Sequence, residues 1–252
     1  MVSRAELQTA LAHGQTVEYQ CQGNLNLYDS PDLNGLATQA VAGRQLQVLP
    51  MALNSAAELS EDVIQVRLCE DDYPAWMALE DLDLLAPAEE PYQAIMLTEA
   101  EISDRLPQVI HFAYAAMKQP NRYLWGGTVG PNYDCSGLTQ TAFASVGIWL
   151  PRDSYQQEAF VQPVALDALQ PGDLLFFGKP ERCSHVAIYI GDGHYIHSSG
   201  KDQGRNGIGI DWLAEQGDTV SQTYYRQLRG AGRVVACYQG KTADPAFSPQ
   251  NV

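Results

Sequence analysis

The sequence predicts an α+β protein in which a small all-β unit precedes a larger unit of helices followed by strands. Short alternating runs separated by turn residues fill the first third of the chain, residues 98–146 show helical periodicity, and strand-like runs dominate residues 171–238. Helices that precede a group of strands are typical of α+β domains. The expected division is a barrel domain at 1–86, a linker at 87–97, a second domain at 98–240 and a C-terminal tail at 241–252, which we expect to be disordered.

The first third of the chain reads as a small barrel because its apolar residues alternate with polar ones. Strand-like runs lie at residues 25–28, 45–49 and 63–68. The turn signal Asp29-Ser30-Pro31-Asp32 follows the first run, as expected where a short strand ends. Residues 3–13 fit a short helix that leads into the barrel.

The second domain follows a change of composition at residues 86–91, where Ala-Pro-Ala-Glu-Glu-Pro reads as a linker. Thr98 and Glu101 then fit a capping box, which predicts the start of a helix. Apolar residues follow at spacings of three and four, as on one face of a helix. Pro107 lies inside this pattern and predicts a kink or a later start.

A second helix is predicted at Cys135–Val146, with Asp134 as its N-cap and Gly147 just past its end. Pro171-Gly172 then opens a series of strands. The predicted strands are residues 174–177, 185–190, 195–198 and 233–238.

The charge of the chain argues against one class of partner. Fifteen Lys and Arg stand against thirty Asp and Glu, which gives a formal net charge of −15. Nucleic acids are bound through clusters of Lys and Arg, and the sequence has no run of basic residues. We therefore expect no nucleic-acid partner.

No stretch of the sequence has the character of a membrane anchor. The first residues, Met1 to Gln8, lack the apolar core of a signal peptide. No later stretch approaches ~18 uninterrupted apolar residues, the length of a transmembrane helix. We therefore expect a soluble, cytoplasmic protein with no membrane span.

The five cysteines, Cys21, Cys69, Cys135, Cys183 and Cys237, are scattered, and none belongs to a Cys-x-x-Cys pair. This spacing indicates neither a zinc knuckle nor a redox dithiol, so we expect no metal and no cofactor. Cys135 differs because it opens a predicted helix, where unpaired N–H groups and the helix dipole favour a thiolate. The same N–H groups can stabilise an oxyanion. The alternative is that Cys135 is a buried structural residue.

Two of the five histidines lie on one predicted hairpin, His185 on its first strand and His197 on its second. If Gly191-Asp192-Gly193 is a three-residue loop, His197 lies opposite Ala187 and on the same face as His185. The two Cα atoms would then be roughly 7–8 Å apart, close enough for the rings to bond. A two-residue turn would put His197 on the other face, so we predict the longer loop.

Other roles for these residues stay open. Each histidine could be a satisfied polar residue in a sheet, and the remaining three histidines are assigned that role because they have no chemical context. A zinc site made of Cys135, His185 and His197 is possible by ligand type, although the sequence has no nearby carboxylate or close-spaced ligand pair to support it.

Several motifs follow one another in the second domain. They are Tyr123-Leu124-Trp125-Gly126-Gly127, Asp134-Cys135-Ser136-Gly137-Leu138, Leu169-Gln170-Pro171-Gly172-Asp173-Leu174-Leu175-Phe176, Ser184-His185-Val186-Ala187-Ile188-Tyr189 and Ile196-His197-Ser198. In this order they resemble the NlpC-type cysteine peptidases, cell-wall hydrolases related in layout to papain, over roughly residues 100–240. The N-terminal segment resembles a bacterial SH3-like barrel at Leu27-Tyr28-Asp29-Ser30-Pro31 and Trp76-Met77-Ala78.

The resemblance implies a papain-like α+β fold and cleavage of peptide bonds in peptidoglycan stems. Carried over by motif, Cys135 is the nucleophile, His185 the general base, and His197 the third residue, which fixes the tautomer of the base. A neutral His197 could accept the Nδ1–H of His185. Tyr123 matches the family's tyrosine near the nucleophile and, with Ser136, is assigned to support of the oxyanion. An ordinary packed aromatic is the alternative for Tyr123.

The two-domain arrangement resembles the cytoplasmic branch that cleaves between γ-D-glutamate and a diamino acid in peptides with a free N-terminal L-alanine. That branch binds the substrate's ammonium with an acidic or hydroxyl patch, because a desolvated ammonium needs an anionic partner. The resemblance offers Tyr73, Asp134, Asp153 and Ser154 as candidates for this patch. The alternative for each is a solvated loop or a helix N-cap.

The functional hypothesis is a γ-D-glutamyl-L-diamino acid endopeptidase that acts through a thioester on murein tripeptides or tetrapeptides, in murein peptide recycling. Two alternatives remain. A non-catalytic protein could bind cell-wall peptides, and an amidase or acyltransferase could use the same Cys135–His185 pair.

Overall fold

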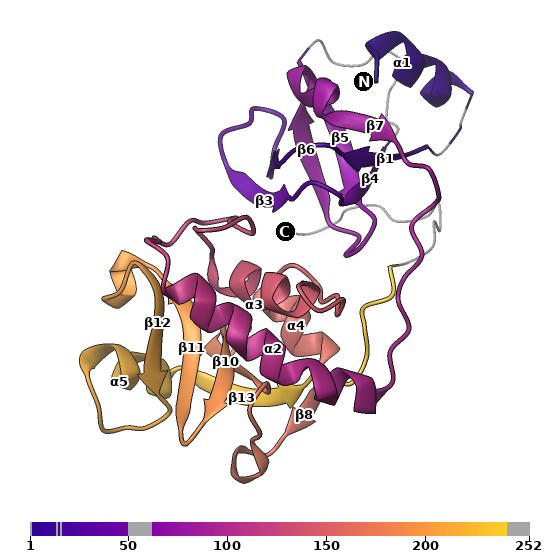
Figure 1. The fold of residues 1–252 in the computed structure, drawn as a ribbon. Coiled ribbons are helices and arrows are strands. Elements are labelled where there is room, and N and C mark those ends of the chain that lie inside the picture. The colour runs from indigo at the N-terminus through magenta and orange to yellow at the C-terminus, as the bar shows by residue number, and fades with distance from the viewer. Residues whose placement is uncertain (1, 14, 16, 50–61, 241–252) are drawn as a thin grey trace.

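The computed structural model describes residues 2–13, 15, 17–49 and 62–240, and it contains two β-sheets (Figure 1). The sheet nearer the N-terminus lies beside the first helices of the second unit. An extended stretch runs along one side of the molecule and joins the first sheet to α2 (Glu99–Met117). The predicted α+β fold with an all-β N-terminal part is confirmed.

The N-terminal unit, called the barrel below, is an antiparallel sheet in the strand order β3-β2-β6-β5-β4-β1-β7. Its strands bury alternating side chains, and Leu27, Leu46 and Ile64 have no exposed surface. Its elements are α1 (Arg4–Ala12), β1 (Glu18–Cys21), β2 (Leu25–Tyr28), β3 (Leu36–Ala40), β4 (Gln45–Val48), β5 (Val63–Leu68), β6 (Pro74–Ala78), the 3-10 helix η1 (Leu79–Leu84) and β7 (Leu85–Pro87).

The C-terminal unit holds the second sheet, in the order β12-β11-β10-β9-β13-β8, with every neighbouring pair antiparallel. After α2 its elements are α3 (Cys135–Ala144), α4 (Ser154–Phe160), β8 (Gln162–Val164), η2 (Leu166–Ala168), β9 (Leu174–Lys179), β10 (Arg182–Gly191), β11 (His194–Ser199), η3 (Lys201–Gln203), β12 (Gly207–Trp212), α5 (Thr219–Arg226) and β13 (Leu228–Arg233).

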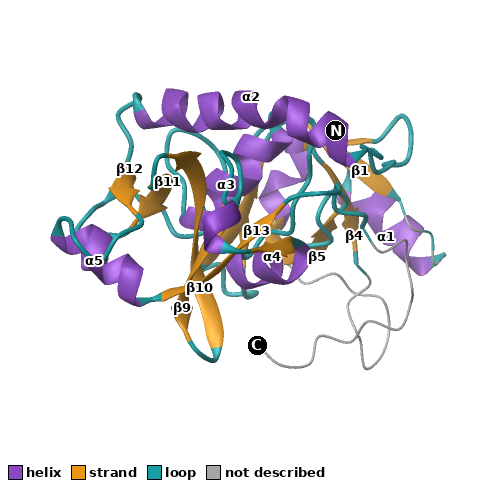
Figure 2. Cartoon of the chain, turned by 90° about the horizontal axis from the view of Figure 1, so that it is seen from below, coloured by secondary structure: helices purple, strands orange, loops and turns teal. Residues whose placement is uncertain are grey.

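The C-terminal sheet is packed on both faces. Val186 and Ile188 of β10 belong to the core shared with α2 and α3, which includes Phe143. Ala187, between them, belongs to the core on the other face, where Tyr224 of α5 packs. Figure 2 shows α2 and α3 near one another and α5 beside β12. Alternate residues of one strand therefore serve different cores, as a pleated strand requires.

Most predicted elements are confirmed. The strands at 25–28 and 63–68 are β2 and β5, and the helix predicted from Cys135 is α3 with Asp134 as its N-cap. The capping box at Thr98 and Glu101 is formed, since Glu101 N donates to Thr98 Oγ1 at 3.3 Å and Thr98 N donates to Glu101 Oε2 at 2.8 Å.

Two local predictions are wrong, and one lies outside the described residues. A later helix start at Pro107 is wrong because α2 begins at Glu99, where the capping box satisfies its first N–H groups. The last strand is not at 233–238. It is the glycine-containing β13, which pairs with β9 and β8 and ends at Arg233. The tail at 241–252 lies outside the part of the chain that the structure describes.

The barrel is hydrogen-bonded to α3 and to the loop before it. The buried carboxylate of Asp71 accepts from Gln140 Nε2 of α3 at 2.8 Å. Thr128 Oγ1 donates to the carbonyl of Gln39 at 2.7 Å, and Gln39 N donates to the same hydroxyl at 3.2 Å. The helix that begins at Cys135 is therefore held from the barrel side as well as by its own sheet.

Candidate active site

Cys135 is the first residue of α3, and the local sequence fixes that start. The Asp134 side chain accepts from Gly137 N at 2.6 Å, which satisfies one of the free N–H groups of the first turn. Gly137 is required by packing, because a Cβ there would lie 2.0 Å from the carbonyl oxygen of Gly127. The loop can thus pass directly over the first turn of the helix. Cys135 is buried, with 7% of its surface exposed.

The hairpin that carries the two histidines has the predicted strand register, but its turn differs from the predicted one. Its turn has two residues, Asp192 and Gly193, both with positive φ, and not the predicted three. A β-bulge between Tyr189 and Gly191 absorbs the extra residue, so Ile188 lies opposite Ile196. The loop prediction was wrong, because a bulge can restore a register that the turn alone would shift.

The two rings lie on the same face, as predicted, and they are bonded. His185 Nε2 and His197 Nδ1 are 2.7 Å apart, and both residues are buried. The nitrogen of His185 used here is Nε2, so the predicted Nδ1 bond is wrong. The physical reason for this difference is the orientation of the His185 ring. Its Nε2 points along the sheet toward β11, which leaves Nδ1 available for another partner.

A carboxylate extends this chain, and the sequence did not reveal it. His197 Nε2 is 2.7 Å from Asp211 Oδ2 on β12, and Asp211 is 3% exposed. Arg205 Nε donates to the same oxygen at 3.0 Å, and its Nη2 bonds Asp211 Oδ1. Asp211 and Arg205 lie in a glycine-containing segment with no recognisable motif, so only the strand pairing of β12 with β11 brings them to the site.

One tyrosine packs on the first imidazole, and the pKa of a second responds to the thiol. The Tyr224 ring stacks on His185 with centroids 4.4 Å apart, and its hydroxyl lies 2.7 Å from Ser199 Oγ. Burial raises the pKa of Tyr123, and next Cys135 and then Asp134 act on it in the same direction. A neutral phenol there keeps an O–H that can be donated.

Burial acts against a charge on the thiol and on both imidazoles. Burial, and then the charge of Asp134, raise the pKa of the Cys135 thiol to about 12, although hydrogen bonds from the Val186 and Ser136 backbone act to lower it. Burial, and then His197, hold the pKa of His185 well below its ordinary value. Burial therefore opposes the expected thiolate, because desolvation outweighs the hydrogen bonds at the helix terminus.

The sulfur nevertheless lies against the strand that carries His185. The backbone that bonds the sulfur belongs to Val186, the residue directly after His185. The Ser136 N–H also faces the sulfur, whereas the Ser136 hydroxyl accepts from Arg152 Nη1 at 2.9 Å. Ser136 can therefore support an oxyanion through its backbone and not through its side chain.

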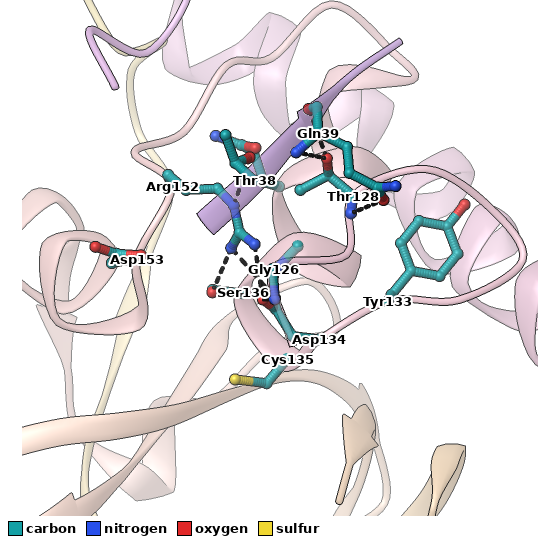
Figure 3. A network of polar contacts seen from close by, with 12 residues as sticks. Thr38, Gln39, Gly126, Thr128, Tyr133, Asp134, Cys135, Ser136, Arg152 and Asp153 are labelled. Carbon is teal, nitrogen blue, oxygen red and sulfur yellow. Dashed lines mark hydrogen bonds and ion pairs between the residues drawn. The ribbon is translucent and has the colours of Figure 1, made fainter. Parts of the chain in front are cut away.

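Figure 3 shows Arg152 between the barrel and the start of α3. Its Nε donates to Thr38 Oγ1 of β3 at 2.9 Å, and its Nη2 donates to Asp134 Oδ2 at 2.7 Å. Gly126 N also donates to Asp134 Oδ2, at 2.9 Å, and Arg152 Nη1 donates to Oδ1 at 3.2 Å. With the Gly137 N–H and the Ser136 hydroxyl, Asp134 Oδ1 has three donors and Oδ2 has two. These bonds disfavour Asp134 as the group that binds the substrate ammonium, because its carboxylate already has donors on both oxygens.

The other three ammonium candidates lie near one another. Burial, and next the charge of Asp153, raise the pKa of Tyr73, so the N-cap residue of α4 acts on this barrel tyrosine. Asp153 is the N-cap residue of α4, and Figure 3 shows its carboxylate turned away from the Arg152 network. Ser154 is buried, and its hydroxyl bonds the thiol of Cys183. Asp153 forms the capping box of α4, and its carboxylate also bonds the Tyr155 hydroxyl, as the N-cap alternative predicts.

Burial raises the pKa of Asp153, and the charge of Arg152 is the strongest effect in the opposite direction. A carboxylate in this position is poorly solvated and gains from a bound cation. The zinc alternative at the two histidines is disfavoured on geometry. Both nitrogens of His197 have partners, one on His185 and one on Asp211, so neither is free to bind a metal.

A thiol at a helix start, with an imidazole chain that ends on a carboxylate, contains the groups from which cysteine hydrolases build a nucleophile, a base and an orienting group. The comparisons agree with this class. Residues 120–229 match the NlpC/P60 family, and residues 27–82 match the bacterial dipeptidyl-peptidase Sh3 domain. Residues 120–229 are therefore an NlpC/P60 domain that follows a bacterial SH3 domain at residues 27–82, as the motifs predicted.

Curated relatives match over short stretches. A γ-D-glutamyl-L-lysine dipeptidyl-peptidase of Bacillus cereus is 48% identical over 79 residues, 30% of this chain and 24% of the relative. A probable endopeptidase of Mycobacterium tuberculosis is 51% identical over 77 residues, 31% of this chain and 20% of the relative. The matches thus span about a quarter or less of these relatives' length.

A crystal structure of an NlpC/P60 family protein from Bacillus cereus is 25% identical and covers 90% of this chain and 66% of that chain, with a TM-score of 0.46. Across the residues that the structure describes, no helix combines the length and the apolar character needed to cross a membrane.

Proposed function

We propose that the protein is a cysteine endopeptidase that cleaves the bond between γ-D-glutamate and a diamino acid in peptidoglycan-derived peptides with a free N-terminal L-alanine. The observation that carries this proposal is the 2.7 Å contact between His185 and His197 on the strands beside Cys135. The name of the Bacillus cereus relative, a γ-D-glutamyl-L-lysine dipeptidyl-peptidase, supports the choice of bond.

In the proposed reaction, Cys135 starts as a neutral thiol. Nδ1 of His185, the nitrogen not bonded to His197, takes the thiol proton while sulfur attacks the γ-carbonyl carbon of the glutamate. The tetrahedral intermediate collapses as the protonated His185 gives this proton to the amine of the departing diamino acid. A thioester on Cys135 remains. His185 then takes a proton from water, hydroxide adds to the thioester, and the proton returns to the leaving sulfur.

The negative oxygen of the intermediate needs donors in place before the reaction. The Ser136 N–H faces the sulfur, and the neutral Tyr123 phenol lies near it, so both are proposed as donors. Fixed donors in a buried site cost little reorganisation when the charge forms. A proton transfer concerted with attack also suits a thiol whose pKa is raised by burial.

The free amine of the substrate is proposed to bind at Asp153, with Tyr73 across from it on the barrel and Ser154 behind it. Their support is the burial of Asp153, its outward carboxylate in Figure 3, and the proximity of the Tyr73 phenol. An ammonium bound at this point fixes the distance from the peptide's N-terminus to the thiol. The position of the N-terminus would then determine which bond is cleaved, which suits short murein tripeptides and tetrapeptides released for recycling.

The proposal is tested with L-Ala-γ-D-Glu-diaminopimelate and its N-acetylated form. We expect release of L-Ala-γ-D-Glu from the first peptide only, and none by Cys135→Ala. Cys21→Ala is the matched control, because Cys21 is a buried cysteine in the barrel core. Equal cleavage of both peptides would overturn the amine requirement. Binding without cleavage would favour the non-catalytic alternative, and a transfer product would favour an acyltransferase.

Asp153→Asn tests the amine site separately. Loss of one charged hydrogen bond, about 1.5–3 kcal/mol, should raise KM for the free peptide roughly ten- to a hundredfold while kcat changes little. Asp167→Asn, an exposed carboxylate on η2, is the control and should leave KM unchanged. In the unchanged protein, KM should rise as the pH falls through the raised pKa of Asp153, because the protonated acid cannot hold the ammonium. A KM unaffected by Asp153→Asn would remove this residue from the site.

A further inference from the structure

The segment from Arg205 to Trp212 places a salt bridge at the far end of the histidine pair. Asp211 is 3% exposed and bonds His197 Nε2 at 2.7 Å, and Arg205 bonds both oxygens of the same carboxylate. No sequence motif marked these two residues. The chain of contacts runs from Arg205 through Asp211 and His197 to His185, on three adjacent strands and one loop.

The pairing of β12 with β11 explains how Asp211 reaches the ring. Tyr195 lies opposite Asp211, and His197 lies opposite Gly209, so Asp211 is the diagonal neighbour of His197. Gly209 leaves the space that Arg205 occupies, because a Cβ there would lie 2.4 Å from Arg205 Nη1. A glycine opposite the histidine therefore lets the guanidinium approach the carboxylate from the open side.

The partners determine where the protons lie. Burial acts to raise the pKa of Asp211, but hydrogen bonds from His197 and Arg205 outweigh it and lower the pKa, so Asp211 is a carboxylate that can only accept. His197 must then carry its proton on Nε2. A neutral His197 has an unprotonated Nδ1, which can only accept, so His185 must carry its proton on Nε2. The nitrogen of His185 left without a proton is Nδ1.

We propose that Asp211, held by Arg205, is a positioning residue that fixes both imidazoles as Nε2–H tautomers and so leaves His185 Nδ1 as the proton acceptor for the thiol. This inference rests on the proposed function of Cys135 and His185. It assigns the Arg205–Asp211 pair a role in the proton arrangement of the site, beyond the Cys135, His185 and His197 set that the motifs indicate.

The other groups around the pair are poor competitors for this role. The rings of Tyr195 and Tyr224 flank His197 with centroids 5.1 and 4.9 Å away. Burial raises the pKa of both phenols, so neither supplies a charge near neutral pH. The charged groups that act on the pKa of His197 are Asp211 and Arg205. The tautomers are therefore set from the β12 side.

Nitrogen-15 NMR of the histidine rings tests the inference without substrate. In the full-length protein near pH 7.5, we expect His185 and His197 each to show a protonated Nε2 and an unprotonated Nδ1. Assignment uses His185→Asn and His197→Asn spectra. In Asp211→Asn the carboxamide can also donate, so His197 Nε2 can become an acceptor and the chain can reverse. We expect a reversed fraction, with the proton on His185 Nδ1.

Activity gives a second measurement. Loss of the orienting carboxylate should lower kcat of Asp211→Asn roughly 10²- to 10⁴-fold with KM nearly unchanged. Asp173→Asn is the matched control, because Asp173 is 1% exposed and bonds Arg233 as Asp211 bonds Arg205, with both arginines 26% exposed. Within the described part of the chain, Asp173 bonds no histidine. This control should keep kcat and the histidine tautomers while losing similar stability.

Arg205→Gln keeps the inference testable should Asp211→Asn not fold. It retains the carboxylate, so the tautomers should persist and kcat should fall about tenfold or less; Arg233→Gln is its control. A proton on His185 Nδ1 in the unchanged protein would overturn the inference, and so would unchanged tautomers and kcat in a folded Asp211→Asn. Because the spectra need no peptide, a wrong substrate and a wrong tautomer assignment give distinguishable results.

Discussion

Two buried aspartates flank the candidate site, and each is paired with an arginine, but they differ in what else they bond. Asp134 receives two backbone N–H groups and the guanidinium of Arg152, whose side chain is 1% exposed. Asp211 receives one imidazole and the guanidinium of Arg205, whose side chain is 26% exposed. Asp134, which bonds backbone N–H groups and a buried guanidinium, holds the loop before α3 in place. Asp211, which bonds an imidazole, can determine which nitrogen of that ring carries the proton.

The largest difference should appear in stability. Arg152→Met leaves the Asp134 carboxylate buried without its cation, so we expect a loss of about 3–5 kcal/mol in the free energy of unfolding. Arg205→Met should cost about 1 kcal/mol, because its partly exposed pair is screened by solvent and Asp211 keeps His197. Urea unfolding measures both. Equal losses of unfolding free energy in the two variants would contradict the distinction between the two ion pairs. Combining Asp134→Asn with Arg152→Met should recover part of the stability that Arg152→Met loses, because no unpaired carboxylate remains buried.

The second test concerns the thiol beside Asp134. Burial raises the pKa of Cys135 to about 12, so the thiolate fraction and the iodoacetamide rate should rise about tenfold per pH unit from pH 7 to 9, or about a hundredfold in all. Cys21 is the internal control, because burial raises its pKa to about 12 as well and it is 1% exposed. Peptide mass spectrometry should find Cys135 modified and Cys21 unmodified. A rate that levels off below pH 7 would indicate a thiolate–imidazolium pair instead.

The third and smallest effect is the response of stability to acid on the Asp211 side. Burial lowers the pKa of His185 and of His197 below the ordinary value, so below about pH 6.5 the unfolded chain binds more protons than the folded protein. The free energy of unfolding should therefore decrease as the pH decreases below about 6.5. The loss is up to about 1.4 kcal/mol per pH unit for each ring that stays neutral in the folded protein. Asp211, whose pKa is lowered, keeps its contribution until more acidic pH.

Urea unfolding at pH 7.5 and 5.5 checks this effect. His185→Asn should reduce the loss of stability between the two pH values, and His111→Gln, at an exposed position on α2, should leave it unchanged. A pH-independent stability in the unchanged protein would mean that the rings accept protons as readily when folded as when unfolded.

The pairing of His185 with His197 could be predicted from the amino-acid sequence alone. Cys135 opens a helix whose N-cap is visible in the sequence, and the histidines could be placed by strand period. The hairpin also shows the limit of that reasoning. A turn length predicts register only if no bulge follows, and the bulge before Gly191 compensates for the short turn.

Asp211 and Arg152 could not be predicted because their roles depend on pairings far along the chain. Asp211 acquires its position only when β12 adds to β11, in a segment whose glycines weaken the strand signal. Arg152 bonds Thr38, 114 residues earlier, and no local pattern encodes that contact. The same reason explains β13, whose glycine-containing sequence has low strand propensity and is held by its neighbours β9 and β8.

The bond from Arg152 to Thr38 has a consequence for how the protein is assembled. During synthesis the barrel leaves the ribosome before Arg152 is made, so it can present the Thr38 hydroxyl as a finished surface. The later part of the chain then closes its nucleophile loop against that surface. In a fragment that lacks the barrel, Arg152 Nε has lost Thr38 as its acceptor. The loop before Cys135 in such a fragment would therefore differ from the loop in the whole chain.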